Sequence, residues 1–145
     1  IIIPKEEATF WLDNQRKLHN ERGEFQHKEI IDFFHSNIKK DKTGYYISQT
    51  YKGVREKVYF RYEDTALFVF DVVKEEGITL ELNTKKTLKL NPKRFFLQNE
   101  DIYIKVGKEK AKFVGRGMER LADLLEYDGC FWITLDEREY RIPEL

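Results

Sequence analysis

The sequence predicts an α+β fold made of mostly antiparallel sheets with two helices, and three observations support this prediction. The stretch 54–82 holds more β-branched and aromatic residues, with fewer breakers, than any other run in the chain, which favours the middle of a sheet. Short alternating segments separated by turn residues recur along the rest of the chain. Two segments, near 27–40 and after 115, instead space their apolar residues as a helix does.

The central stretch reads as strands joined by tight turns. Val58, Phe60 and Tyr62 alternate with polar positions, which predicts a half-buried strand. The next run, 67–73, is apolar on both faces except at Asp71, so we expect a strand covered on both sides. A polar connection ending in Gly77 and an alternating run at 78–82 then predict a hairpin.

The two ends of the chain have the same expected order of elements. Strands are expected at 10–12, 17–19 and 45–51 around a helix at 27–40, with a loop at 20–24. Later strands are expected at 95–97, 102–106, 111–113, 131–135 and 140–142, with a helix from about Gly115 through Leu125 that stops at Asp128-Gly129.

This order predicts two similarly built lobes (strand, strand, helix, strand, strand) around the central hairpin. The N-terminal lobe is expected at 1–66, and the hairpin with the C-terminal lobe at 67–145. Each lobe has too few elements to cover its own apolar faces, so we expect a shared core.

Composition indicates a globular protein, with 36% charged and 41% hydrophobic residues. No apolar run is long enough to span a bilayer. The single cysteine, Cys130, permits no internal disulfide, which is typical of a reducing compartment. We therefore expect a cytoplasmic protein without membrane contact.

Charge is unevenly distributed although the net charge is zero. The segment 85–120 has eleven basic and four acidic residues, whereas 121–145 has two basic and seven acidic residues. Such asymmetry indicates an interaction surface or two solvated faces that attract each other.

Several short motifs resemble a known family. They are Arg16-Lys17-Leu18-His19 with Gly23 and His27, then Glu63-Asp64-Thr65 within VYFRYEDTALFVFDVV, and Leu90-Asn91-Pro92 followed by IYIKV, AKF and Arg116. Together they resemble DUF1285, a bacterial family of domains of unknown function, from about His19 to the end of the chain. The resemblance implies a repeated α+β fold and a role in signalling or ligand binding, and it implies no catalytic residue.

Candidate ligand-binding residues are Glu63, Asp64, Thr65 and Arg116. The two adjacent acids could bind a cation or exchange protons, but neighbours in an extended chain point to opposite faces, and Asp and Thr also stabilise turns. Arg116 precedes a helix, where an anion would be favoured. A flexible entry to that helix is the more ordinary interpretation.

Candidate nucleic-acid-binding residues are Lys93, Arg94, Lys105 and Lys112 in the basic segment, where aromatic residues are interleaved. Zero net charge and the core-like alternation of those aromatics argue against this function. The three histidines and Cys130 lack metal-ligand spacing, so no metal is expected. No cofactor motif is present, and Cys130 resembles a small core residue more than a nucleophile.

The sequence therefore favours a non-enzymatic binding or interaction module, regulatory or signalling in character, that holds a small ligand or a protein partner between its lobes. An enzyme of undetermined type and a nucleic-acid binder using 85–120 are the alternatives.

Overall fold

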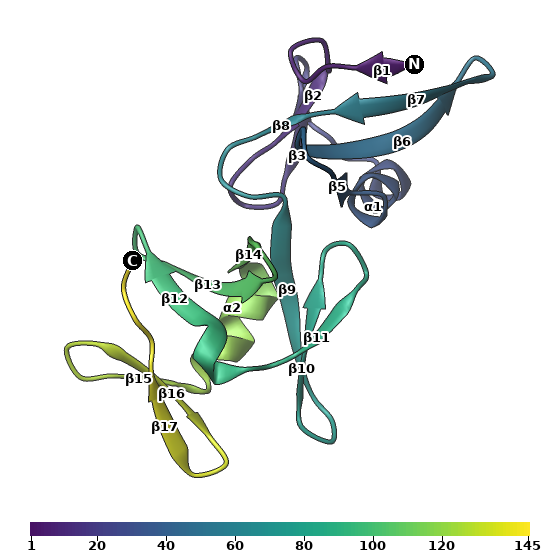
Figure 1. Cartoon of the computed structure of the whole chain (residues 1–145). Coiled ribbons are helices and arrows are strands. Elements are labelled where there is room, and N and C mark those ends of the chain that lie inside the picture. Colours follow the sequence, from purple (N-terminus) through teal and green to yellow (C-terminus); the bar gives the residue numbers. More distant parts are fainter. The chain divides into compact units, whose positions relative to one another are not determined.

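The computed structural model describes all 145 residues, which divide into two compact units, Ile1–Ala66 and Leu67–Leu145 (Figure 1). Two α-helices, one short 3-10 helix and seventeen strands in four sheets make up the chain. Most strand pairs are antiparallel, and only β1–β7, β2–β8 and β9–β14 are parallel. The predicted α+β class is confirmed.

The first unit contains two four-stranded sheets. One has the order β1 (Ile2–Ile3), β7 (Val54–Tyr59), β6 (Tyr45–Tyr51), β5 (Lys39–Lys40). The other has the order β4 (Gly23–Glu24), β3 (Leu18–Asn20), β2 (Phe10–Leu12), β8 (Arg61–Tyr62). The expected loop at 20–24 therefore ends in a short strand.

The first helix, α1 (Lys28–Ser36), is shorter than the predicted 27–40. Asn37 ends it, because its side-chain amide donates to the Phe33 carbonyl at 2.7 Å and its backbone N–H donates to Phe33 and Phe34. These bonds satisfy the last carbonyls of the helix. Lys39 and Lys40 then pair with β6 instead of continuing the helix.

Aromatic rings form much of the core of the first unit. Phe34 of α1 contacts Phe60 edge to face, with ring centroids 4.9 Å apart, and Phe10 at 5.6 Å. Phe60 is 1% exposed and separates β7 from β8. The prediction of one alternating strand through Tyr62 is wrong, because burying this ring takes the chain out of one sheet and into a parallel pair with β2 in the other.

The second unit is built on a six-stranded sheet. Its order is β11 (Thr87–Lys89), β10 (Ile78–Leu82), β9 (Leu67–Lys74), β14 (Glu109–Phe113), β13 (Asp101–Val106), β12 (Phe95–Gln98), and the 3-10 helix η1 (Pro92–Arg94) joins β11 to β12. The β9–β10 hairpin is confirmed. In β9, Phe68 and Val69 are fully buried and Val72 is 2% exposed, so this strand is covered on both faces as predicted.

The second helix, α2 (Gly115–Ala122), packs on β9 and ends earlier than predicted. Leu125 does not lie on the helix, since β15 (Leu125–Tyr127) pairs with β16 (Phe131–Leu135), which pairs with β17 (Arg138–Arg141). Asp128-Gly129 forms the β15–β16 turn and not a helix stop. Pairing Leu125 with the fully buried Ile133 outweighs one further helical turn.

Each helix is followed by a three-stranded antiparallel sheet segment, β5-β6-β7 after α1 and β15-β16-β17 after α2. The hairpins before the helices belong to different kinds of sheet, since β2–β3 lies in a four-stranded sheet and β13–β14 in the six-stranded one. The similarity of the two lobes stays a prediction. Neither helix has the length and apolar character needed to cross a lipid bilayer.

Candidate functional site

A groove of about 660 Å³ lies in the second unit, and we call it the basic groove. It lies between the segment from β11 to η1 and the strand β13. From β11 the chain runs through η1 directly into β12, which pairs with β13 and places Phe95 opposite Ile104, so the segment through η1 comes to lie beside β13. Its lining residues are Leu88, Lys89, Leu90, Asn91, Pro92, Arg94, Ile104, Lys105, Val106 and Gly107.

Local structure fixes the wall that contains η1. Pro92 stands at the start of η1, where a missing N–H costs nothing. The Asn91 side chain caps η1 by accepting from the Lys93 N–H at 3.0 Å. The Leu90 N–H donates to the Ile78 carbonyl at 2.9 Å, which ties the segment to β10. These contacts fix the backbone of η1, from which Arg94 lines the groove.

The electrostatic character of the basic groove is one-sided. Lys89, Arg94 and Lys105 are exposed and their side chains form no hydrogen bond or ion pair within the chain, and no acidic residue lines the groove. Between these cations lie aliphatic side chains, among them Leu88, Leu90 and Val106. The groove therefore offers positive charge at its edge and apolar surface inside.

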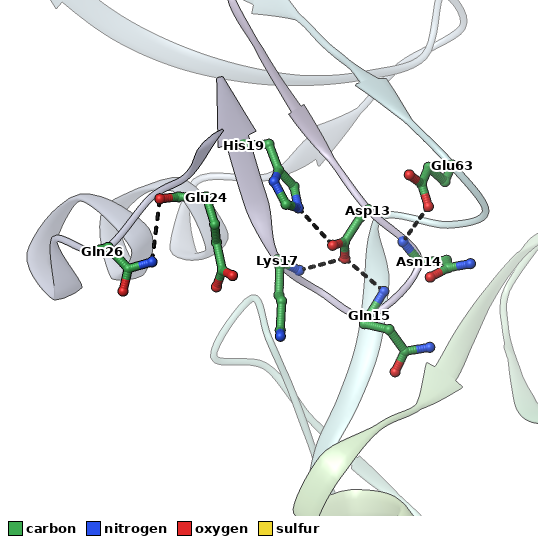
Figure 2. Close-up of polar contacts among 8 residues, drawn as sticks. All are labelled: Asp13, Asn14, Gln15, Lys17, His19, Glu24, Gln26 and Glu63. Carbon is green, nitrogen blue, oxygen red and sulfur yellow. Dashed lines mark hydrogen bonds and ion pairs between the residues drawn. The ribbon is translucent and has the colours of Figure 1, made fainter. Parts of the chain in front are cut away.

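A second polar cluster surrounds the β2–β3 turn of the first unit (Figure 2). Asp13 Oδ1 accepts from the backbone N–H groups of Gln15 and Lys17 at 2.8 and 2.9 Å, and Asp13 Oδ2 contacts His19 Nε2 at 2.7 Å. Glu63, just after β8, accepts from the Asn14 N–H at 3.1 Å. Both carboxylates thus hold the turn in place.

Opposing effects set the pKa of Asp13. Partial burial raises the pKa, whereas the hydrogen bonds from His19 and from the Lys17 and Gln15 N–H groups lower it by more, so the pKa lies below its ordinary value of 3.8. Asp13 is therefore ionised at neutral pH and orients the imidazole of His19.

The Asp13 cluster borders a row of stacked side chains. His19 and Arg61 are the cross-strand neighbours of Trp11 in β3 and β8, which flank β2 on opposite sides. The His19 ring stacks on Trp11 at 5.7 Å, and the Arg61 guanidinium also lies 5.7 Å from the Trp11 ring centroid. Trp11 thus contacts an imidazole from one neighbouring strand and a guanidinium from the other, and these cross-strand contacts stabilise the sheet.

The predicted ligand-binding residues are divided between the two units. Glu63 is exposed and braces the turn described above, Asp64 is half-buried, and Thr65 is 3% exposed. Arg116 belongs to the second unit, where its guanidinium lies 3.8 Å from the carboxylate of Asp71. That carboxylate also accepts from Arg120 at 2.7 Å.

The predicted nucleic-acid-binding residues also separate. Arg94 and Lys105 line the basic groove together, whereas Lys93 is exposed outside it. Lys112 is only 3% exposed and its ammonium lies 3.4 Å from the Asp101 carboxylate. Its charge is satisfied inside the chain, so it does not present a cation to a phosphate backbone.

Sequence reasoning missed two features. The Asp13–His19 pair could have been inferred from the hairpin, since the register that pairs Trp11 with His19 brings Asp13 near. Lys89 had no such signal, because its place in the groove depends on how the chain turns through η1 into the β12–β13 pair. No group of three or more His, Cys, Asp or Glu side chains is arranged to hold a metal ion.

Comparison with known proteins shows what the fold is similar to. A DUF1285 family protein from Silicibacter pomeroyi DSS-3 matches 98% of this chain and 82% of its own, with a TM-score of 0.64 and 15% sequence identity. A DUF1285 family protein from Shewanella baltica OS155 matches 80% of this chain and 91% of its own, with a TM-score of 0.53 and 14% identity. No protein-family model and no curated protein matches the sequence.

At such low identity, the likeness concerns the fold alone. It agrees with the motifs at Arg16–His19, Glu63–Thr65 and Leu90–Pro92 that resemble the same family. The resemblance to DUF1285 is therefore confirmed at the level of structure, and over most of its length this chain has the fold of the DUF1285 family proteins.

Proposed function

We propose that this chain is a non-enzymatic binding module whose basic groove holds a small amphipathic anion. The observation that carries the proposal is the set of three cations, Lys89, Arg94 and Lys105, that have no internal partner and surround an aliphatic floor. Exposed cations usually pair with nearby acids or spread over a surface. Here they surround a cavity of about 660 Å³, a size typical of small-molecule sites.

The chemistry of the lining defines the ligand. Arg94 favours a planar or multivalent anion such as a phosphate or a carboxylate, since its guanidinium donates two parallel hydrogen bonds. Leu88, Leu90 and Val106 favour an apolar body attached to that head group. All the lining residues belong to the second unit, so this ligand needs no site between the two lobes.

Isothermal titration calorimetry with decyl phosphate tests the proposal. We expect saturable binding of decyl phosphate. Inorganic phosphate should bind more weakly because it lacks the apolar chain, and decanol should bind more weakly because it lacks the anionic head group. Equal affinity for decyl phosphate and decanol would show that the cations do not contribute to binding. No binding of decyl phosphate would contradict the proposal.

Two charge reversals of equal size locate the site. Lys105→Glu places a carboxylate in the groove and should weaken decyl phosphate binding by about tenfold or more. Lys108→Glu changes the net charge equally at an exposed position in the adjoining turn, outside the lining, and should change affinity less than about twofold. Equal effects would mean that general attraction, not the groove, binds the anion.

The same pair of variants separates this function from nucleic-acid binding. A nucleic acid contacts many phosphates and would depend on exposed lysines throughout 85–120, including Lys108. If a short single-stranded RNA binds more tightly than decyl phosphate, and both charge reversals weaken it equally, the nucleic-acid function is favoured instead.

A further inference from the structure

We propose that the first unit carries a separate binding site for an uncharged, planar heteroaromatic compound. The site is a cavity of about 440 Å³ whose lining residues all belong to the first unit, and we call it the aromatic pocket. Its chemistry differs from that of the basic groove, so the two sites would take different ligands.

Aromatic rings make the walls of this pocket. Tyr45, Tyr59 and Phe60 line it from the core side, with exposed fractions of 4%, 7% and 1%. Tyr62 is 38% exposed and its ring meets that of Tyr45 edge to face at 5.2 Å. A flat ligand would find offset or edge contacts with several rings at once.

Asp41 and Lys57, which lie beside Tyr59 of the pocket wall, are already paired with each other. Asp41 accepts from Lys57 at 2.5 Å and from the Tyr59 hydroxyl at 2.6 Å. These two bonds hold the pKa of Asp41 well below its ordinary value and the pKa of Lys57 well above it. The pair therefore stays fully charged and mutually neutralised at physiological pH.

The loop at the mouth is held in one shape by the same carboxylate. Asp41 Oδ1 accepts from the Thr43 and Gly44 N–H groups at 2.9 and 3.3 Å. The pocket thus needs little ordering when a ligand enters, and a preformed site costs less binding free energy.

The polar groups left for a ligand carry no net charge. Lys5 and Glu6 line the pocket with opposite charges. Thr43 and Tyr62, which carry hydroxyl groups, also line the pocket. Residues with hydroxyl groups beside aromatic walls suit the ring nitrogens and exocyclic groups of a neutral heterocycle. Because the charges of Lys5 and Glu6 offset each other, the lining has no net charge to favour an anion.

Nuclear magnetic resonance titration of the whole chain with adenine, and separately with indole, tests this inference. We expect saturable shifts of the backbone amide signals of the non-proline residues in 2–6 and of 43–45 and 59–62, with the signals of the basic groove unchanged. Failure of both probes to produce saturable shifts in these segments would overturn the proposal.

Tyrosine variants provide matched controls. Tyr62→Ala removes a partly exposed wall and should weaken binding about three- to tenfold, whereas Tyr51→Ala removes a tyrosine that is 56% exposed outside the pocket and should leave binding unchanged. Equal affinities of the two variants would contradict the site.

A blocking variant covers the case in which Tyr62→Ala disturbs the fold. Thr43 is exposed at the mouth, so Thr43→Trp should fill the entrance and abolish the shifts while the other amide signals keep their positions. Undiminished binding to this variant would also overturn the proposal. Because Lys105→Glu alters only the basic groove, it should leave adenine and indole binding unchanged, and this separates the two sites.

Discussion

At the scale of single residues, Asp13 shows how one carboxylate organises a turn and a histidine. It accepts two backbone N–H groups through Oδ1 and contacts His19 through Oδ2 (Figure 2). Glu63, just after β8, holds the same turn by accepting from the Asn14 N–H. Asp13 therefore has a structural role in the first unit, and its contribution to the stability of the fold depends on its charge.

Replacing Asp13 should reveal a pH-dependent contribution to stability. The pKa of Asp13 is below 3.8 in the folded chain, so the unfolded chain binds the proton more readily and the stabilisation exists above that value. It is lost as pH falls through the folded-state pKa. We expect Asp13→Asn to lower the free energy of unfolding by about 1–2 kcal/mol at pH 7.

Urea unfolding monitored over a pH series checks this. The difference between the wild type and Asp13→Asn should be constant near neutral pH and should shrink as the pH drops below about 4. Glu21→Gln, an exposed acid in the next turn, serves as the control and should show little effect. A difference that stays the same at all pH values would contradict the assigned role of the charge.

Asp71 is the corresponding residue in the second unit, since it places a carboxylate within an otherwise apolar strand. Its side chain is 10% exposed, and two arginines of α2 reach it at different distances, Arg120 at 2.7 Å and Arg116 at 3.8 Å. The Val72 N–H also donates to it. The shorter contact should contribute most of the stabilisation.

The two arginines therefore make a matched pair for mutation. Arg120→Met should lower the free energy of unfolding by about 1.5 kcal/mol, because it removes a hydrogen bond to a largely buried charge. Arg116→Met should cost less than about 0.5 kcal/mol, since Arg116 is 64% exposed and more distant. Chemical denaturation of both variants measures this, and equal losses would mean that the closer contact has no special role.

At the scale of elements, the packing of α2 on β9 depends on a residue with no side chain. A Cβ atom on Gly117 would overlap the Val69 carbonyl oxygen and lie 3.0 Å from the Val69 carbonyl carbon. Gly117 thus permits the helix backbone to approach the strand closely. This approach also brings Arg120 to Asp71.

Gly117→Ala should therefore destabilise the second unit even though alanine favours helices. The added methyl group would overlap the backbone of β9, so the helix would have to move away from the strand. We expect this overpacking to lower the free energy of unfolding by about 1–3 kcal/mol. Thermal and urea unfolding measure the loss. As a control, Glu119→Ala at an exposed position of the same helix should change stability by less than about 0.5 kcal/mol. If Gly117→Ala leaves stability unchanged or raises it, the helix does not pack closely on the strand at this position.

At the scale of the whole molecule, a net charge of zero conceals a strongly basic segment. Within that segment the fold treats its cations differently. Lys112 is buried beside Asp101, and Lys110 donates to Gln98 at 3.0 Å, whereas Lys89, Arg94 and Lys105 surround a groove. The number of basic residues in the segment is therefore larger than the number that present free charge at the surface, and composition does not show where those residues lie.

A ligand of the basic groove should stabilise the chain in a salt-dependent way. Decyl phosphate at about one hundred times its dissociation constant should raise the free energy of unfolding by about 2.7 kcal/mol. Thermal unfolding at low and high salt measures the effect, which should decrease as salt screens the cations. An effect that grows with salt would indicate apolar binding alone, and decanol is the control for that case.

How far the sequence predicts the fold depends on whether local patterns decide the structure. The alternation at 45–51 and 102–106 and the apolar run at 67–73 correspond closely to β6, β13 and β9. Both helices were expected at the right places, but each ends earlier than its apolar spacing indicates. Asn37 caps one, and pairing of Leu125 with Ile133 ends the other.

The sequence alone determined the α+β class and the positions of the main strands and helices, because these depend on side-chain periodicity and on turn residues close together in the chain. It also showed a family resemblance that the fold confirms. Only the tertiary structure decided that the stretch through Phe60 divides between two sheets, that Lys112 is buried, and that Lys89 lies near Arg94 and Lys105. Local patterns do not decide these features, because strand pairing depends on residues far apart in the chain and is settled when buried rings and charges find their partners.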